Sequence, residues 1–157
     1  MHFRPTSLFA LATLIGTGAL GAQSVDACTK PRDACAFFAA FVSAFNRRDW
    51  PAFRATLDPN VSVIFDRPGP PLRQDGHDAV ESVFRQIFPD TPSVGGTPLS
   101  QIQPQELRVQ DFGNVVVLSF HLSAPTGVGR RTLVLRRAAG RWTVVHIHGS
   151  SSGSGSE

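Results

Sequence analysis

The chain has 157 residues, and its net charge of +3 falls to +2 if Arg4 is removed with a leader. A charge this small gives little support for binding nucleic acid, so we expect no nucleic-acid partner. Lys30 is the only lysine, which argues against Schiff-base chemistry within a folded core.

The N-terminus has the pattern of a secretory signal. Met1–Ser7 contains Arg4, and a run of apolar and small residues follows from Leu8 to Ala22. The run is shorter than the roughly 20 apolar residues that a membrane span needs, although an uncleaved N-terminal anchor is the alternative. We expect residues 1–22 to be a signal peptide. The remaining 135 residues would be exported to the periplasm or secreted, without stable membrane insertion.

Two cysteines, Cys28 and Cys35, follow the predicted leader seven positions apart. In an oxidising compartment such a pair most simply forms a disulfide, which would pin the N-terminal lead-in, 23–32, to the first helix. A redox-active pair is the alternative, but it favours the shorter Cys-x-x-Cys spacing.

Three helices are predicted. The first has Asp33 as its N-cap and an apolar stripe at three- and four-residue spacing. The second begins at Asp49, has Pro51 in its first turn and ends near Leu57. The third follows Gly76. The apolar positions of the first and third helices are Phe37, Phe38, Phe41, Val42, Phe45, Val80, Val83, Phe84, Ile87 and Phe88.

The strands lie mostly in the second half of the chain. One strand, 61–66, separates the second and third helices and is followed by a proline-rich loop at 67–74. Later segments rich in strand-forming residues, separated by tight turns, predict an antiparallel meander. These segments are 102–112, 115–123, 130–138 and 141–148. The Ser- and Gly-rich end, 151–157, predicts a flexible tail.

This order predicts a single α+β domain over residues 33–150, with a curved antiparallel sheet wrapped by three N-terminal helices. Several strands are apolar on both faces, including 115–117 and 132–135. Because the helices cover one face, we expect the outer face to pack against a second copy in a homodimer.

Two blocks resemble the SnoaL-like group of the nuclear transport factor 2-like superfamily, which has a cystatin-like, cone-shaped fold. The first is residues 41–50, ending in an Asn-x-x-Asp corner, with 57–61 and Gly76 after it. The second joins 131–137 to 140–150. The end of this second block, with Trp142 and His146-Ile147-His148-Gly149-Ser150, is also similar to the association domain of calcium/calmodulin-dependent kinase II. These folds serve enzymes, binding proteins and assembly modules.

The resemblance allows two family sites to be compared. Ketosteroid isomerases of this fold use a tyrosine and two acids, but Phe41 and Phe65 stand at two of these positions, and Asp66 lies one residue beyond the second. The chain has no tyrosine, and 130–138 has no acid, so we expect no isomerase chemistry of that kind.

The kinase association domain lines its pocket with arginines. At the matching positions this chain has Leu133 and Gly149. Arg131 and Arg136 could replace those arginines by a different route.

Histidines and one aspartate are the candidates for chemistry. Asp66 and His121 could transfer protons if both face the cavity. His146 and His148 point to one side of a strand, and with His121 they could bind zinc. The alternative is that the histidines are structural, and we expect no metal and no cofactor.

The leading hypothesis is an apolar pocket that binds a small hydrophobic molecule. Its expected ligand-binding residues are Phe41, Phe45, Trp50, Phe65, Phe84, Phe120 and Arg131. A pocket enzyme of the isomerase, cyclase or hydrolase type, using Asp66 and His121, is the first alternative. A non-catalytic dimerisation or interaction module is the second.

Overall fold

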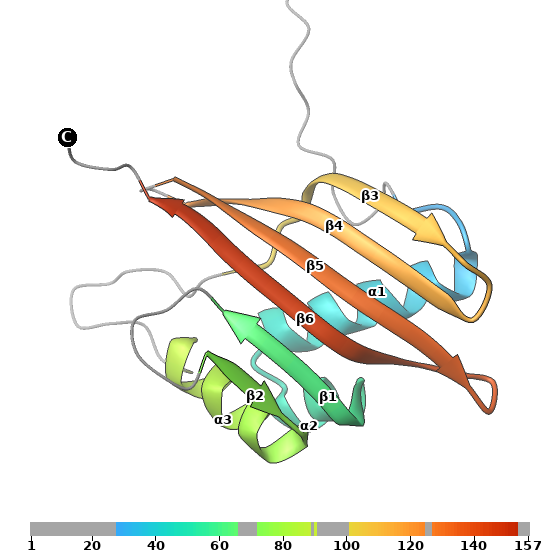
Figure 1. The fold of residues 1–157 in the computed structure, drawn as a ribbon, viewed down its shortest axis with the longest axis horizontal. Coiled ribbons are helices and arrows are strands. Elements are labelled where there is room, and N and C mark those ends of the chain that lie inside the picture. Colours follow the sequence, from blue (N-terminus) through green and yellow to red (C-terminus); the bar gives the residue numbers. More distant parts are fainter. Residues whose placement is uncertain (1–27, 66–71, 89, 91–100, 125–126, 154–157) are drawn as a thin grey trace, which may run out of the picture.

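The computed structural model describes residues 28–65, 72–88, 90, 101–124 and 127–153. They form three helices and a curved six-stranded sheet, with α1 lying along one face of the sheet (Figure 1). In chain order the elements are α1 (Arg32–Asn46), α2 (Trp50–Ala55), β1 (Leu57–Phe65), β2 (Arg73–Asp75), α3 (His77–Ile87), β3 (Gln105–Asp111), β4 (Val115–Ala124), β5 (Gly127–Ala138) and β6 (Arg141–Gly153).

The strand order is β2-β1-β6-β5-β4-β3. The predicted antiparallel meander is confirmed for β3 to β6, whose neighbours pair antiparallel. β1 differs because it pairs parallel with β6, placing Phe65 opposite Gly149. The first strand thus joins the last one, which the local pattern of either strand does not reveal.

The three helices begin in different ways. Asp49 caps α2 by accepting a hydrogen bond from the backbone N–H of Ala52 at 3.1 Å, as predicted. α1 begins two residues earlier than expected, because Pro31 rather than Asp33 occupies the N-cap and Asp33 lies in the first turn. Gly76 precedes α3 with a φ of +83°, a conformation that favours glycine.

Several predicted boundaries were wrong. β1 begins at Leu57, where the second helix was expected to end, because the chain passes directly from the α2 C-cap into the strand. β6 continues to Gly153, so Ser151 and Ser152 belong to the sheet rather than to a flexible tail. These serines pair with the first residues of β5, and the pairing supplies hydrogen-bond partners for their backbone N–H and C=O groups. Composition alone had suggested that this backbone is bonded to water. β2 also lies partly within the expected loop 67–74.

The core lies between the helices and the sheet. Four phenylalanines are almost completely buried there: Phe38, Phe41, Phe45 and Phe53. The predicted disulfide is confirmed, with the Cα atoms of Cys28 and Cys35 5.4 Å apart, and it ties the lead-in to α1. Within the described ranges, no helix is long and apolar enough to cross a membrane.

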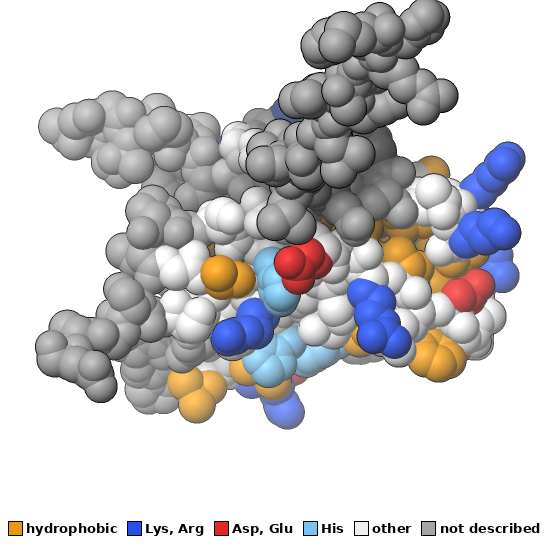
Figure 2. Space-filling model, turned by 90° about the horizontal axis from the view of Figure 1, so that it is seen from above, with side chains coloured by type: hydrophobic (Ala, Val, Ile, Leu, Met, Phe, Trp, Pro, Cys, Tyr) orange, Lys and Arg blue, Asp and Glu red, His pale blue; other side chains and the backbone are white. Residues whose placement is uncertain are grey.

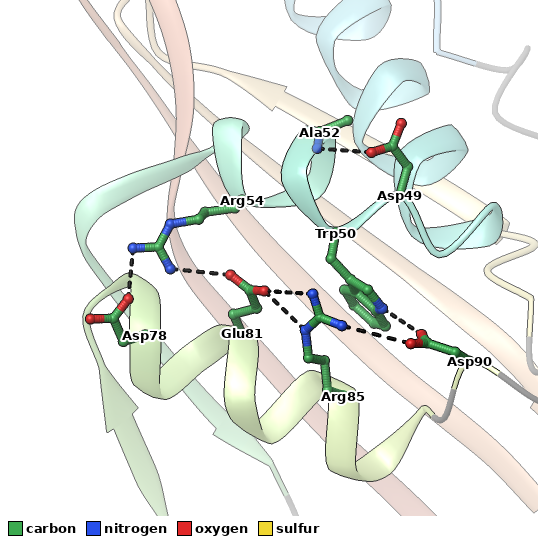
Figure 3. A network of polar contacts seen from close by, with 8 residues as sticks. All are labelled: Asp49, Trp50, Ala52, Arg54, Asp78, Glu81, Arg85 and Asp90. Atoms are coloured by element: carbon green, nitrogen blue, oxygen red, sulfur yellow. Dashed lines mark hydrogen bonds and ion pairs between the residues drawn. The ribbon is translucent and has the colours of Figure 1, made fainter.

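A charged network fixes α3 against α2 (Figure 3). Glu81 lies at its centre and accepts from Arg54 of α2 at 3.1 Å and from Arg85 of α3 at 2.9 Å. Arg54 also contacts Asp78 at 2.7 Å, and Arg85 reaches Asp90 at 3.7 Å. The network holds in place the helix that supplies two aromatic rings to the site described next.

Candidate functional site

A cavity of about 220 Å³ lies between the helices and the inward face of the sheet. Its wall is mostly apolar and contains six phenylalanines: Phe41, Phe45, Phe65, Phe84, Phe88 and Phe120. Ile102, Leu122, Leu133, Val128 and Ile147 complete the apolar lining. The polar side chains at the cavity are Gln101, Ser123, Arg131, Ser151 and Ser152.

Simple periodicity brings these side chains together. Phe41 and Phe45 are four residues apart in α1, so they lie on the same helix face. Phe84 and Phe88 have the same spacing at the end of α3. In the sheet, alternate residues of β4 and of β5 face inward, which places Phe120 next to Arg131 across the strand pair.

Four of the lining phenylalanine rings pack against one another: Phe45, Phe65, Phe84 and Phe88. The ring centroids of Phe45 and Phe88 are 4.9 Å apart with nearly perpendicular planes, and those of Phe65 and Phe84 are 5.2 Å apart. Edge-to-face pairs of this kind add to the stability that burial provides. This part of the wall is therefore held in place by the packing of its own rings.

Arg131 is the one charged side chain of the cavity wall among the described residues. Its Nη1 donates to the backbone oxygens of Arg130 at 2.8 Å and Ser150 at 3.0 Å. Burial lowers the pKa of the Arg131 guanidinium, and no ion pair joins it to a carboxylate in the described part of the chain. A cation therefore lies in largely apolar surroundings, held by neutral carbonyls.

Two glycines make room for this arginine. A Cβ at Gly129 would lie 3.1 Å from Nη1 of Arg131, so the guanidinium rests against the bare backbone of β5. A Cβ at Gly149 would lie 3.3 Å from Cδ of Arg131 and closer still to the ring of Phe65. The cavity wall thus depends on missing side chains as well as on those present.

The structure places most of the expected ligand-binding residues at the cavity: Phe41, Phe45, Phe65, Phe84, Phe120 and Arg131. Trp50 is elsewhere, buried in the core with Arg85 stacked over its ring and its indole N–H bonded to Asp90. The prediction that Trp50 lines the cavity was wrong, because the first turn of α2 directs its side chain toward α3.

The condition for proton transfer, that His121 faces the cavity, is not met. Its neighbours Phe120 and Leu122 line the cavity, so strand alternation turns His121 to the opposite face of the sheet. There its Nδ1 lies 3.1 Å from Oε2 of Glu106. Figure 2 shows histidines at the molecular surface beside arginines and an acidic group. Asp66, the other candidate for proton transfer, lies outside the described residues.

His146 and His148 share the outward face of β6, because Ile147 between them points inward. Nδ1 of His146 lies 2.8 Å from Oγ of Ser62, a bond that fits the structural alternative. Burial lowers the pKa of His146, and the nearby His148 lowers it further. β5 separates both histidines from His121 on β4. In the described segments no group of three or more potential ligands could hold a metal ion.

Arg136 pairs with a carboxylate away from the cavity. Its Nη2 lies 2.7 Å from Oδ2 of Asp58, which also accepts from Oγ1 of Thr143 at 3.2 Å. Of the two arginines considered as replacements for the kinase-domain pair, Arg131 lines the cavity and Arg136 does not. Leu133 also lines it, and the ring of Phe65 lies against Gly149.

Sequence reasoning missed the serine-bearing side of the cavity. Ser151 and Ser152 were assigned to a tail, and Ser123 was placed in a strand without a role. The local sequence of Ser151 and Ser152 carries no signal for a strand, because they join the sheet through their pairing with Gly129 and Val128 of β5.

Comparisons with known proteins agree with this architecture. The family model of the SnoaL-like domain matches residues 35–152. No curated protein matches the chain significantly. Among solved structures, a cystatin-like fold protein from Burkholderia xenovorans is 19% identical with a TM-score of 0.60, covering 79% of this chain and 95% of its own.

Two further structures are similar. An NTF2-like protein from Cytophaga hutchinsonii is 12% identical with a TM-score of 0.59, covering 79% of this chain and 100% of its own. An NTF2-like protein of unknown function from Pseudomonas putida is 17% identical with a TM-score of 0.57, covering 74% and 82%. At these identities the likeness establishes the fold alone. The family match over residues 35–152, which is most of the chain, shows that this chain belongs to the SnoaL-like domain family.

Proposed function

We propose that this protein is an exported binding domain that takes up a small hydrophobic molecule in its phenylalanine-lined cavity. The observation that carries the proposal is the cavity itself, about 220 Å³ of space walled mainly by aromatic and aliphatic side chains. Binding sites for small molecules are concave and apolar, with a few polar groups that fix orientation. An apolar cavity of roughly 150 Å³ accommodates benzene. A ring with a short substituent therefore suits the space.

Proton transfer by Asp66 and His121 is a weaker proposal. A general acid and a general base must both reach the same bound molecule. His121 lies on the face of the sheet opposite the cavity lining, with Glu106 as its neighbour. We therefore propose binding without assigning a reaction.

Occupation of the cavity can be tested with 3-phenylpropan-1-ol and ethylbenzene as probes in calorimetric titration. We expect the wild type to bind at least one of them and Leu133→Trp to bind neither, because the larger side chain fills the cavity. Phe112→Trp is the matched control, since Phe112 is exposed at the β3–β4 turn and far from the lining. Absence of binding to the folded wild type, or unchanged binding by the filled variant, would contradict the proposal.

Export is supported by the leader pattern and by a disulfide between Cys28 and Cys35, as is typical of an oxidising compartment. Expression of the full chain in a bacterium with a periplasm should yield a protein beginning near residue 23. Intact-mass analysis would show loss of the leader and the two-hydrogen deficit of one disulfide. An uncleaved, reduced chain in the cytoplasm would contradict it.

We also propose a homodimer through the outward face of the sheet. Four half-buried aliphatic side chains point outward there: Ile64, Val117, Val134 and Val145. A second copy of the same face would cover them and remove apolar surface from water. Light scattering should report a dimer for the wild type and a monomer for Val134→Arg, which introduces like charges at the interface. A monomeric wild type at high concentration would end this proposal.

A further inference from the structure

The position of Arg131 points to the chemical class of the ligand. The side chain leaves β5 between Phe120 of β4 and Gly149 of β6, and its guanidinium turns along its own strand toward Gly129. Leu122 and Ser151 flank Gly129 in the neighbouring strands and also line the cavity. The charge thus lies between the aromatic part of the cavity and its serine-bearing part.

The hydrogen bonds of Arg131 leave one edge of the guanidinium for a ligand. Nη1 is used by the backbone oxygens of Arg130 and Ser150. Nε and Nη2 have no bond to any described residue, and together they form the side edge of the planar fork. Two parallel N–H donors on this edge match the two oxygens of a carboxylate.

The described carboxylates are engaged elsewhere. Asp58 binds Arg136, Asp33 binds Arg137, and Glu106 lies beside His121. The acids on α3 and after it belong to the network around Glu81, and Asp75 pairs with Arg73. Asp49 and Asp111 accept from backbone N–H groups of their own turns. None of these nine acids neutralises Arg131.

A cation in apolar surroundings is costly unless an anion pairs with it. We propose that the cavity binds a small amphiphilic carboxylate, with its apolar body among the phenylalanines and its carboxylate on the Nε–Nη2 edge of Arg131. This inference rests on the proposed function and adds the charge of the ligand. A single ring with a two- or three-carbon acid chain fits both the volume and the one positive charge.

The experiment compares 3-phenylpropanoate with 3-phenylpropanamide, which has nearly the same shape and no charge. Calorimetric titration of the wild type at neutral pH is expected to show at least tenfold tighter binding of the carboxylate. In Arg131→Gln, the ratio of the amide dissociation constant to the carboxylate dissociation constant should fall close to one, while the affinity for the amide is kept. Arg131→Lys should restore part of the preference, because it keeps the charge and loses the fork.

Arg130→Gln is the matched control, since Arg130 is the neighbouring arginine on the exposed, opposite face of β5. It should leave the ratio unchanged, which would exclude a general effect of net charge. Asp66→Asn tests whether an acid outside the described residues already neutralises Arg131. The inference would be overturned if the wild type bound the amide and the carboxylate equally and Asp66→Asn bound the carboxylate more tightly than the amide.

The outcomes separate this inference from the proposed function. If the amide and the carboxylate bind equally in both the wild type and Arg131→Gln, the cavity binds apolar molecules but the carboxylate assignment is wrong. If neither binds to folded wild type, and 3-phenylpropan-1-ol and ethylbenzene do not bind either, the proposed function fails as well. Circular dichroism of each variant shows whether a loss of binding reflects a loss of fold.

Discussion

The ring of Phe65 lies directly against the backbone of Gly149, its partner in the parallel pair of β1 and β6. A Cβ at Gly149 would approach Cδ1 of this ring to 2.6 Å, closer than real Cβ contacts come. Because Gly149 has no side chain, the ring of Phe65 can reach the cavity and the side chain of Arg131 can pass beside the glycine. Two residues far apart in the sequence fix one wall of the site.

Gly149→Ala is expected to lower the free energy of unfolding by about 1–3 kcal/mol, the range for overpacking a well-packed site. It should also weaken binding of 3-phenylpropanoate, because the displaced Phe65 ring would occupy cavity space. Urea unfolding of Gly149→Ala, Phe65→Leu and the double variant measures the coupling between the two sites. Strictly additive effects would contradict the contact.

Asp58→Asn is expected to destabilise the fold by about 1–3 kcal/mol at pH 7, because it weakens a buried acceptor for Arg136 and Thr143. Burial alone would raise the pKa of Asp58, but the bonds from Asn60 N–H, Arg136 and Thr143 outweigh it, so the pKa lies below the usual value. Because the folded pKa is the lower one, this stabilisation is complete above the unfolded value of about 3.9. It is lost as the pH falls through the folded pKa.

Urea unfolding at pH 7 and at pH 2.5 tests the Asp58 prediction. The difference in the free energy of unfolding between the wild type and Asp58→Asn should be smaller at pH 2.5 than at pH 7. Asp75→Asn is the control, because Asp75 forms an exposed pair with Arg73. A gap that stays constant with pH would show that the charge of Asp58 does not stabilise the fold.

Mild acidification is expected to weaken the fold through His146. Its pKa is lowered by burial and then by His148, so the neutral ring bonded to Ser62 is favoured. Because the folded pKa lies below the unfolded value of about 6.5, this contribution is complete above that pH and declines as the pH falls below it. Proton NMR titration should find a lowered pKa for His146, and His148→Gln should raise it. An unchanged value in His148→Gln would refute the interaction.

Glu81→Gln is expected to lower the free energy of unfolding by about 1 kcal/mol, because Glu81 accepts from both Arg54 and Arg85 and is mostly buried. The helix α3 should become less firmly held, which hydrogen exchange of its backbone amides would report. Asp78→Asn is the control, because its side chain is 93% exposed and its pairing with Arg54 should contribute little. Equal effects of the two substitutions would show that burial does not determine the strength of this network.

Much of the fold could be predicted because local signals agreed with one another. The cap at Asp49, the apolar stripe with Phe41 and Phe45, and the turns of the meander each determine their element from nearby residues. The predictions were wrong where a distant partner decides. Ser151 and Ser152 are in a strand because β5 offers them hydrogen bonds, and β1 extends to Leu57 because β6 lies beside it.

The candidate site divides in the same way. The supply of phenylalanines, the two cysteines and the presence of Arg131 were determined by the sequence itself, because composition and helical spacing require no partner. Only the tertiary structure decided that Trp50 and His121 turn away from the cavity and that Arg136 pairs with Asp58. It also decided that, among the described residues, the hydrogen bonds of the Arg131 side chain are made by Nη1 alone. The physical reason is that the direction of a side chain and its pairing depend on strand register and on groups that meet across the sheet.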